Sequence, residues 1–185
     1  MTLRKASAYS KKRIMPFTRN SRAKAKAYIK VVPHSKIAKY TGGNHGASVD
    51  GTHKYAIKLV SEQKCLVRDN ALESIRMLLT KMLDEKVPGQ YYLKINVHPH
   101  HFLRENKTAA GAGADRISTG MTQAYGIVIG RAAIVGAGEN LATVTCTDEK
   151  TARTIKDFMP SVKAKIPSKT KIVFQKLEMP AVAAQ

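Results

Sequence analysis

The stretch from Asn70 to Gly89, NALESIRMLLTKMLDEKVPG, decides the fold class of this 185-residue chain. Its large apolar residues recur at the 3.6-residue spacing of an amphipathic helix: Leu72, Ile75, Leu79, Met82 and Leu83. Asn70 and Glu73 have the spacing of a capping box, in which each side chain satisfies a backbone N–H of the other residue. Pro88-Gly89 marks the end. The segment therefore predicts a helix that begins at Asn70 and has one buried face.

The segments on both sides of this helix alternate between apolar and polar residues, the pattern of half-buried strands. Strands are expected around residues 55–60, 65–67, 93–97, 127–135, 141–146 and 171–177. A second helix is expected after Thr147, which can cap it, with carboxylates in its first turn and Pro160 at its end. Strands interrupted by two separate helices predict an α+β fold, a mainly antiparallel sheet sandwich with two principal helices.

Composition divides the chain into three parts. Residues 1–50 form a basic extension that ends in a glycine-rich run, 41–50, which we expect to be flexible. Residues 51–178 have the character of one globular α+β domain, and residues 179–185 form a short tail. This length suits one domain with an extension.

Positive charge is concentrated in the extension. The chain has 32 Lys and Arg against 13 Asp and Glu, a formal net charge of +19, and its first acidic residue is Asp50. Such a segment repels itself unless it lies beside dense negative charge, of which nucleic acid is the commonest source. The residues expected to bind the phosphates of a nucleic acid are Arg4, Lys5, Lys11, Lys12, Arg13, Arg19, Arg22, Lys24, Lys26, Lys30 and Lys36.

The same segment does not suit a membrane surface. Between Arg19 and Tyr28 the uncharged residues are mostly alanine and small polar residues, which offer too little apolar surface to insert. We find neither a secretory signal nor an apolar run long enough to span a bilayer. The expected location is the cytosol, with no membrane partner and with Cys65 and Cys146 as reduced, buried thiols.

The motifs typical of catalytic and metal sites are incomplete. His98, His100 and His101 would need Glu105 as a fourth metal ligand, so we expect these imidazoles to stack or to form hydrogen bonds. The glycine-rich stretch 111–116 lacks the third glycine of a dinucleotide fingerprint, and Lys107-Thr108 lacks the glycines of a P-loop. We therefore expect no metal, no cofactor and no enzymatic activity.

Residues 106–120 are unlike the core segments. They contain one large apolar residue, Ile117, among glycines, alanines and polar residues. Two arms of about seven residues at ~3.3 Å each would reach roughly 20–25 Å from the body. Long loops in compact domains are usually functional or disordered. Composition alone leaves two alternatives open, a loop that approaches a partner closely and an ordinary surface loop.

The segment from Leu93 to Asn106, LKINVHPHHFLREN, carries a family resemblance together with three later motifs: Gly113–Arg116, Gly120-Met121 and Tyr125-Gly126. In this order they resemble the universal large-subunit ribosomal protein sixteen family, called "ten-e" in archaea and eukaryotes. Pro16-Phe-Thr-Arg19 is similar to part of the basic arm of that family. The resemblance spans roughly residues 3–135 and favours an archaeal chain.

The resemblance implies a structural constituent of the large ribosomal subunit, because peptide-bond chemistry belongs to the RNA. It implies binding to large-subunit ribosomal RNA near the A-site tRNA and the peptidyl transferase region, with A-site and P-site tRNA and neighbouring ribosomal proteins as partners. The residues that match the family's loop near the tRNA, and its base, are Arg104, Asn106, Lys107, Gly111, Gly113, Asp115, Arg116 and Met121.

Two other functions remain as alternatives. A basic DNA-organising protein of the chromatin type would explain the charge, but it would bind any duplex and would not need the small-residue loop. A nucleotide-dependent enzyme would use the stretch from Gly111 to Arg116 to bind phosphates.

Overall fold

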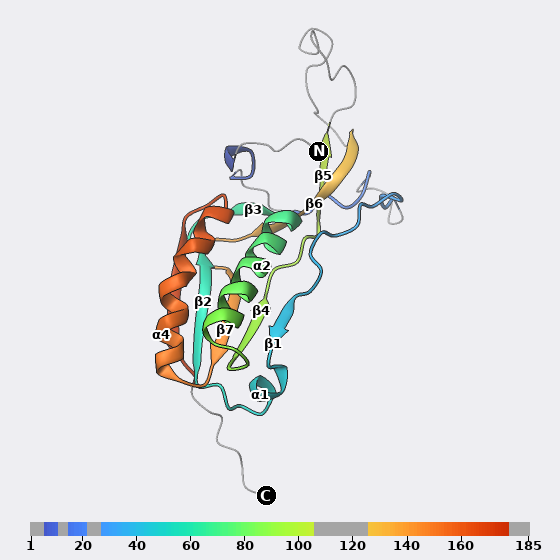
Figure 1. Cartoon of the computed structure of the whole chain (residues 1–185). Helices are drawn as coiled ribbons and strands as arrows, with labels where there is room; N and C mark the ends of the chain where they lie inside the picture. Colours follow the sequence, from blue (N-terminus) through green and yellow to red (C-terminus); the bar gives the residue numbers. More distant parts are fainter. Residues whose placement is uncertain (1–5, 11–14, 22–26, 106–125, 178–185) are drawn as a thin grey trace, which may run out of the picture.

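The computed structural model describes residues 6–10, 15–21, 27–105 and 126–177. Figure 1 shows the two long helices side by side on one face of a sheet, with a strand pair that projects beyond them at one end. The strands form two sheets, and every strand pair is antiparallel. The expected α+β fold with antiparallel sheets and two principal helices is confirmed.

The larger sheet has five strands in the spatial order β1-β4-β7-β2-β8. These strands are β1 (Thr41–Gly43), β4 (Tyr91–Ile95), β7 (Asn140–Cys146), β2 (Tyr55–Ser61) and β8 (Thr170–Lys176). Its central strands carry the alternating residues that predicted them, because one face of the sheet meets the core and the other does not.

The smaller sheet has three strands in the order β3-β6-β5: β3 (Cys65–Arg68), β6 (Ile127–Val135) and β5 (His101–Glu105). The register of β5 against β6 shifts between Leu103 and Arg104. Beyond β3, the paired strands β5 and β6 continue away from the helices as a two-stranded projection, here called the β5–β6 ribbon (Figure 1).

The principal helices are α2 (Asp69–Lys86) and α4 (Glu149–Phe158), and α4 continues into the 3₁₀ helix η2 (Met159–Lys165). Two short helical segments complete the described secondary structure, η1 (Ala6–Ala8) and α1 (His45–Val49).

The core lies between the helices and the larger sheet. Leu93, Val144 and Ile57 are aligned across β4, β7 and β2, and all three are fully buried. Helix α2 places Leu79 on this layer and α4 adds Ile155, both completely covered. Each such side chain stabilises the fold by about 1.5–3 kcal/mol.

The expected capping of α2 is wrong. The helix begins at Asp69, with Arg68 at the N-cap position, and Asn70 already lies inside the helix. The Asp69 carboxylate accepts a hydrogen bond from the Asn70 N–H at 2.9 Å, whereas Glu73 turns to Arg76 and to Ala38. The Glu73 carboxylate, which a capping box would use, therefore binds Arg76 of the same helix and the backbone of Ala38 instead.

Two other local expectations also fail. Asp148 is the N-cap of α4 and makes no side-chain capping hydrogen bond, so Thr147 is not its cap. The run 41–50, expected to be flexible, forms β1 and α1, and Asn44 caps α1 through a 3.1 Å hydrogen bond from the Ala47 N–H. Gly43 permits this path with a φ of +84°, where a Cβ would collide with the carbonyl of Tyr91.

Candidate nucleic-acid interface

The N-terminal basic segment is attached to the base of the β5–β6 ribbon. The Phe17 N–H donates to Nδ1 of His101 at 2.9 Å, and the Phe102 N–H donates to the Phe17 carbonyl at 3.0 Å. His101 is buried, so its ring serves as an internal acceptor for the basic segment. Residues 15–21 and 27–40 are called the arm below.

Further along, the arm is held by the first turns of helix α2. The Lys36 N–H donates to the Asp69 carboxylate at 3.0 Å, and the Ala38 N–H donates to the Glu73 carboxylate at 3.1 Å. Both acceptors are side chains of the body, and both donors are backbone groups of the arm. The arm backbone is therefore fixed while the Lys36 side chain stays exposed.

Two more hydrogen bonds complete the attachment. The Arg131 Nε–H on β6 donates to the Pro33 carbonyl at 2.8 Å, and the Ile95 N–H donates to the Tyr40 carbonyl at 2.7 Å. The arm thus runs from the ribbon, past the start of α2, to the edge of the larger sheet, where it becomes β1. In Figure 1 this path follows one side of the body.

Two arginines of this region lie against aromatic rings. The Arg104 guanidinium lies 3.8 Å from the ring centroid of Phe17, and that of Arg131 lies 5.6 Å from the centroid of Phe102. Stacking against a ring orders the planar guanidinium, a group whose geometry matches phosphate. The ribbon and the arm therefore present oriented cations together.

The arm also contains a short antiparallel contact. Arg19 and Tyr28 form an isolated β-bridge, and the guanidinium lies 4.4 Å from the ring centroid and donates to the hydroxyl at 2.8 Å. The Asn20 N–H donates to the Ala27 carbonyl at 2.9 Å. Tyr28 remains 54% exposed, so its ring has a free surface.

Two histidines of the His98–His101 motif lie beside the end of the arm. The His98 ring lies 4.3 Å from the Tyr40 ring and 6.0 Å from the ring of His100, and both histidines are exposed. Within the described parts of the chain, no group of three His, Cys, Asp or Glu side chains could hold a metal ion. Exposed imidazoles beside cations are suited to stacking and to hydrogen bonding with RNA.

The contacts of Glu73 with Arg76 and with the arm lower the pKa of its carboxyl group. Its hydrogen bond from Arg76 holds the pKa of the carboxyl below its ordinary value of 4.5, and the Ala38 N–H acts in the same direction. The same pair raises the pKa of Arg76. The arm is thus attached to an ionised carboxylate.

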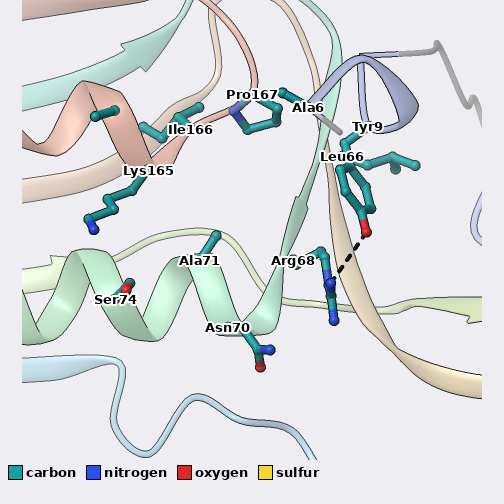
Figure 2. Close-up of a pocket in the computed structure, with 11 residues that line it drawn as sticks. Ala6, Tyr9, Leu66, Arg68, Asn70, Ala71, Ser74, Lys165, Ile166 and Pro167 are labelled. Carbon is teal, nitrogen blue, oxygen red and sulfur yellow. Dashed lines mark hydrogen bonds between the residues drawn. The ribbon is translucent and has the colours of Figure 1, made fainter. Parts of the chain in front are cut away.

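A pocket of about 550 Å³ lies between η1, the start of α2 and the end of η2 (Figure 2). Tyr9, Arg68 and Lys165 line it together with apolar side chains such as Leu66 and Ile166. Arg68 donates to the Tyr9 hydroxyl at 3.3 Å, and the Leu66 N–H donates to the Tyr9 carbonyl at 2.7 Å. These contacts fasten the first described residues of the chain to the body.

The structure brings together only some of the residues expected to bind RNA. Arg19, Lys30 and Lys36 lie on the arm, and Arg104 lies on the ribbon. The other expected phosphate-binding residues lie outside the described residues: Arg4, Lys5, Lys11, Lys12, Arg13, Arg22, Lys24 and Lys26. The same holds for the loop residues Asn106, Lys107, Gly111, Gly113, Asp115, Arg116 and Met121, and hence for the glycine-rich stretch 111–116.

Sequence reasoning missed Arg131. Its signal was available, because it is the single charged residue in the otherwise apolar stretch of β6, IVIGRAAIV. A cation in such a strand needs a partner, and here the partners are the Pro33 carbonyl and the Phe102 ring. The pairing of β5 with β6 that creates this site was not predicted.

The two thiols are free and buried, as expected. Burial, with a smaller effect of Asp148, raises the pKa of Cys146 to about 12, so this thiol stays protonated at neutral pH and is a poor nucleophile. No helix within the described residues is both long and apolar enough to cross a membrane.

Comparison with known proteins gives one consistent family. The family described as Ribosomal protein L16p/L10e matches residues 13–173. Proteins named large ribosomal subunit protein uL16 align over nearly their whole length. That of Staphylothermus marinus is 40% identical over 179 residues (96% of this chain, 97% of that protein), and that of Methanococcus aeolicus is 37% identical over 177 (95% and 96%). The Pyrobaculum arsenaticum protein is 36% identical over 176 residues (95% and 93%).

Proposed function

Because the chain belongs to the ribosomal protein L16p/L10e family, we propose that it is a structural, non-catalytic constituent of the large ribosomal subunit. There it binds ribosomal RNA and neighbouring ribosomal proteins. Within the subunit we assign it to the region of the A-site tRNA and the peptidyl transferase centre. The relatives named above are large-subunit proteins of archaea, which agrees with an archaeal origin.

The observation that carries this proposal is the attachment of the arm to the β5–β6 ribbon. Arg104 and Arg131 are oriented by aromatic rings, and the exposed Lys30 and Lys36 follow on a backbone that the body holds in place. Phosphate contacts from such a preordered row fix position and register on an RNA. Residues 1–50 are therefore assigned to RNA binding, residues 51–178 to the globular domain and residues 179–185 to a tail.

We assign the segment 106–120 to tRNA positioning, with Arg104 at its base. The ribbon projects from the end of the body (Figure 1), and in the sequence this segment follows β5 and precedes β6. A deletion of 106–120 is expected to leave incorporation into subunits intact and to slow translation or late subunit maturation. A deletion variant that supports translation at the normal rate would contradict this role.

The first test is a sucrose gradient of a cell lysate, with this chain quantified by mass spectrometry before and after a high-salt wash. Purely electrostatic binding through six to ten phosphates weakens by about 10³–10⁵ between 50 and 200 mM salt. Retention at one copy per large subunit after the wash supports an integral ribosomal protein. Release to the top of the gradient contradicts it.

A competition experiment separates this function from a DNA-organising one. The purified chain is bound to protein-free large-subunit ribosomal RNA, and duplex DNA of random sequence is added as competitor. A ribosomal constituent is expected to retain the RNA against a large excess of duplex, whereas a chromatin-type protein would be displaced at comparable concentrations. Displacement of the chain by duplex DNA at a concentration comparable to that of the ribosomal RNA would contradict the proposal.

A further inference from the structure

The two faces of the larger sheet differ in what covers them. Helices α2 and α4 lie on the face that carries Ile57, Leu93 and Val144, and these residues share one core cluster with the helices (Figure 1). Side chains alternate between faces along a strand, so the neighbours of these residues point to the opposite face. That opposite face is called the open face.

The strand register defines a row of residues across the open face. Thr41 pairs with Lys94, Lys94 with Thr143, Thr143 with Lys58, and Lys58 with Val173. Lys94 is exposed, whereas Lys58, Thr143 and Val173 are half-buried, as in a sheet face whose side chains shield one another. The row lies at the solvent side of the molecule.

Three lysines of the open face lie close together. Lys58 and Lys94 are two strands apart, which is roughly 10 Å at the usual strand spacing. Lys171 pairs with Val60 on the adjacent strand and points to the same face as Lys58. No ion pair involves any of these lysines among the described residues. The three charges therefore stand together without neutralisation.

The helices on the other side are electrically different. The five strands of the larger sheet contain no Asp or Glu at all, whereas α2 and α4 contain as many acidic as basic residues. On the helices Arg76 pairs with Glu73, and Arg153 pairs with Glu149 at 2.6 Å. The body thus has a sheet side whose strands carry cations without acidic residues, and a helix side on which the charges of α2 and α4 balance and η2 adds two lysines.

Hydrogen bonds within the protein already hold the polar side chains of the open face in place. The Thr143 hydroxyl accepts hydrogen bonds from the side-chain amides of Asn96 and Asn140, each at 2.8 Å. Lys58 donates to the Gln175 side chain at 2.7 Å, which holds its ammonium group over the sheet. A rigid surface of this kind loses little conformational entropy when it binds.

We propose that the open face of the larger sheet is a second RNA-binding surface, which receives a phosphodiester backbone on Lys58, Lys94 and Lys171. Charge complementarity identifies the occupant, because an array of lysines without acidic residues matches a row of phosphates. This inference rests on the proposed function and deepens it. It orients the body with its sheet side toward ribosomal RNA and its helix side away.

The test measures the salt dependence of binding to protein-free large-subunit ribosomal RNA. One variant carries Lys58→Gln, Lys94→Gln and Lys171→Gln. Its matched control removes the same charge from the helix side with Lys81→Gln, Lys150→Gln and Lys156→Gln. If the three sheet lysines contact phosphates, the slope of log K against log salt falls by about 2–2.7 in the first variant, at 0.7–0.9 for each contact. The control slope is expected to stay close to that of the wild-type chain.

A third variant separates charge from folding. Lys58→Arg, Lys94→Arg and Lys171→Arg together keep the charge and should keep the wild-type slope. Equal slopes for the sheet-side and helix-side Gln variants would overturn the proposal. A wild-type chain that binds duplex DNA as well as ribosomal RNA would instead overturn the proposed function, so the two failures are distinguishable.

Lysine acetylation in purified large subunits tests the same surface in its natural setting. Lys58, Lys94 and Lys171 are expected to be protected, while Lys81 and Lys156 on the helices react. Equal reactivity of both sets would overturn the proposal. Protection of the sheet lysines without any change of salt slope would show that an acidic protein covers this face, and it would equally overturn RNA as the occupant.

Discussion

In the body, Leu79, Leu93 and Val144 are completely buried, whereas in the arm Tyr28 and Val31 are 54% and 84% exposed. The body is held by apolar side chains packed between two helices and a sheet. The arm places one side chain, Ile37, in the core and is otherwise held by hydrogen bonds from its backbone and by guanidinium groups stacked on rings. The comparison teaches that one part of the chain is stable through its own burial, while the other is positioned for a partner.

The largest expected effect is a loss of stability when a buried side chain of the body is removed. Leu79→Ala removes a fully buried side chain between α2 and the sheet and should lower the free energy of unfolding by about 2–5 kcal/mol. Met77 on the same helix is 59% exposed, and Met77→Ala should change it by less than about 0.5 kcal/mol. Chemical denaturation measures both values, and equal losses would contradict this account of the core.

The next effect tests the attachment of the arm. Asp69 is buried and accepts the Lys36 and Asn70 N–H groups, so Asp69→Ala should cost about 1–3 kcal/mol. It should also speed tryptic cleavage after Lys36 and Lys39. Asp157→Ala, on the exposed side of α4, is the control and should alter neither measurement. Unchanged proteolysis in the Asp69 variant would show that the arm is held elsewhere.

A third prediction concerns the pH dependence of Glu73, the carboxylate of the body that binds the arm at Ala38. The pKa of Glu73 is lowered, chiefly by Arg76, so its ionised form stabilises the fold at and above its unfolded pKa. That contribution should be lost as the pH falls below 4.5 and through the lower folded pKa. Glu73→Gln should cost about 1 kcal/mol at neutral pH and should flatten this acid loss. Denaturation curves at neutral and acidic pH provide the comparison, and parallel pH profiles would contradict the assignment.

The smallest effect concerns the arm alone. Tyr28→Phe removes the hydrogen bond from Arg19 but keeps the ring, at a site that is largely exposed. The free energy of unfolding should change by less than about 0.5 kcal/mol. Amide exchange at Asn20 and Ile29, whose N–H groups bond across this contact, should nevertheless become faster. A large drop in melting temperature would contradict a purely local role for this contact.

Sequence patterns located the elements whose formation depends on burial. The spacing of Leu72, Ile75 and Leu79 predicted α2, and the alternation in residues 93–97 and 141–146 predicted β4 and β7. These patterns are reliable because a one-residue shift would move every apolar side chain into water.

The elements that were missed depend on partners far away in the sequence. β1 consists of Thr-Gly-Gly, without any apolar alternation, and becomes a strand because it pairs with β4. β5 carries Arg104 and Glu105 and is buried at only one of its five residues, so it resembles a loop in sequence. The cap of α2 was misplaced by two residues, from Arg68 to Asn70, since Asp69 could not be known to bind the arm.

Only the part of the interface that does not depend on distant partners was predicted from the sequence. A run of cations without acidic residues is visible in any sequence, so the arm was identified. The stacking of Arg104 on Phe17 and the charge difference between the two faces of the body both depend on strand pairing. The lysines of the open face are scattered along the chain and form a surface only in the folded sheet.

The strand order also constrains when this protein can fold during its synthesis. β2 is made early, yet its two neighbours, β7 and β8, come from the last third of the chain. Until Asn140 and the residues after it have been translated, β2, which contains Ile57 and Leu59, has neither of its neighbouring strands to pair with. Such long-range pairing slows folding. A nascent chain must therefore have emerged from the ribosome as far as Lys176 before the larger sheet can be completed.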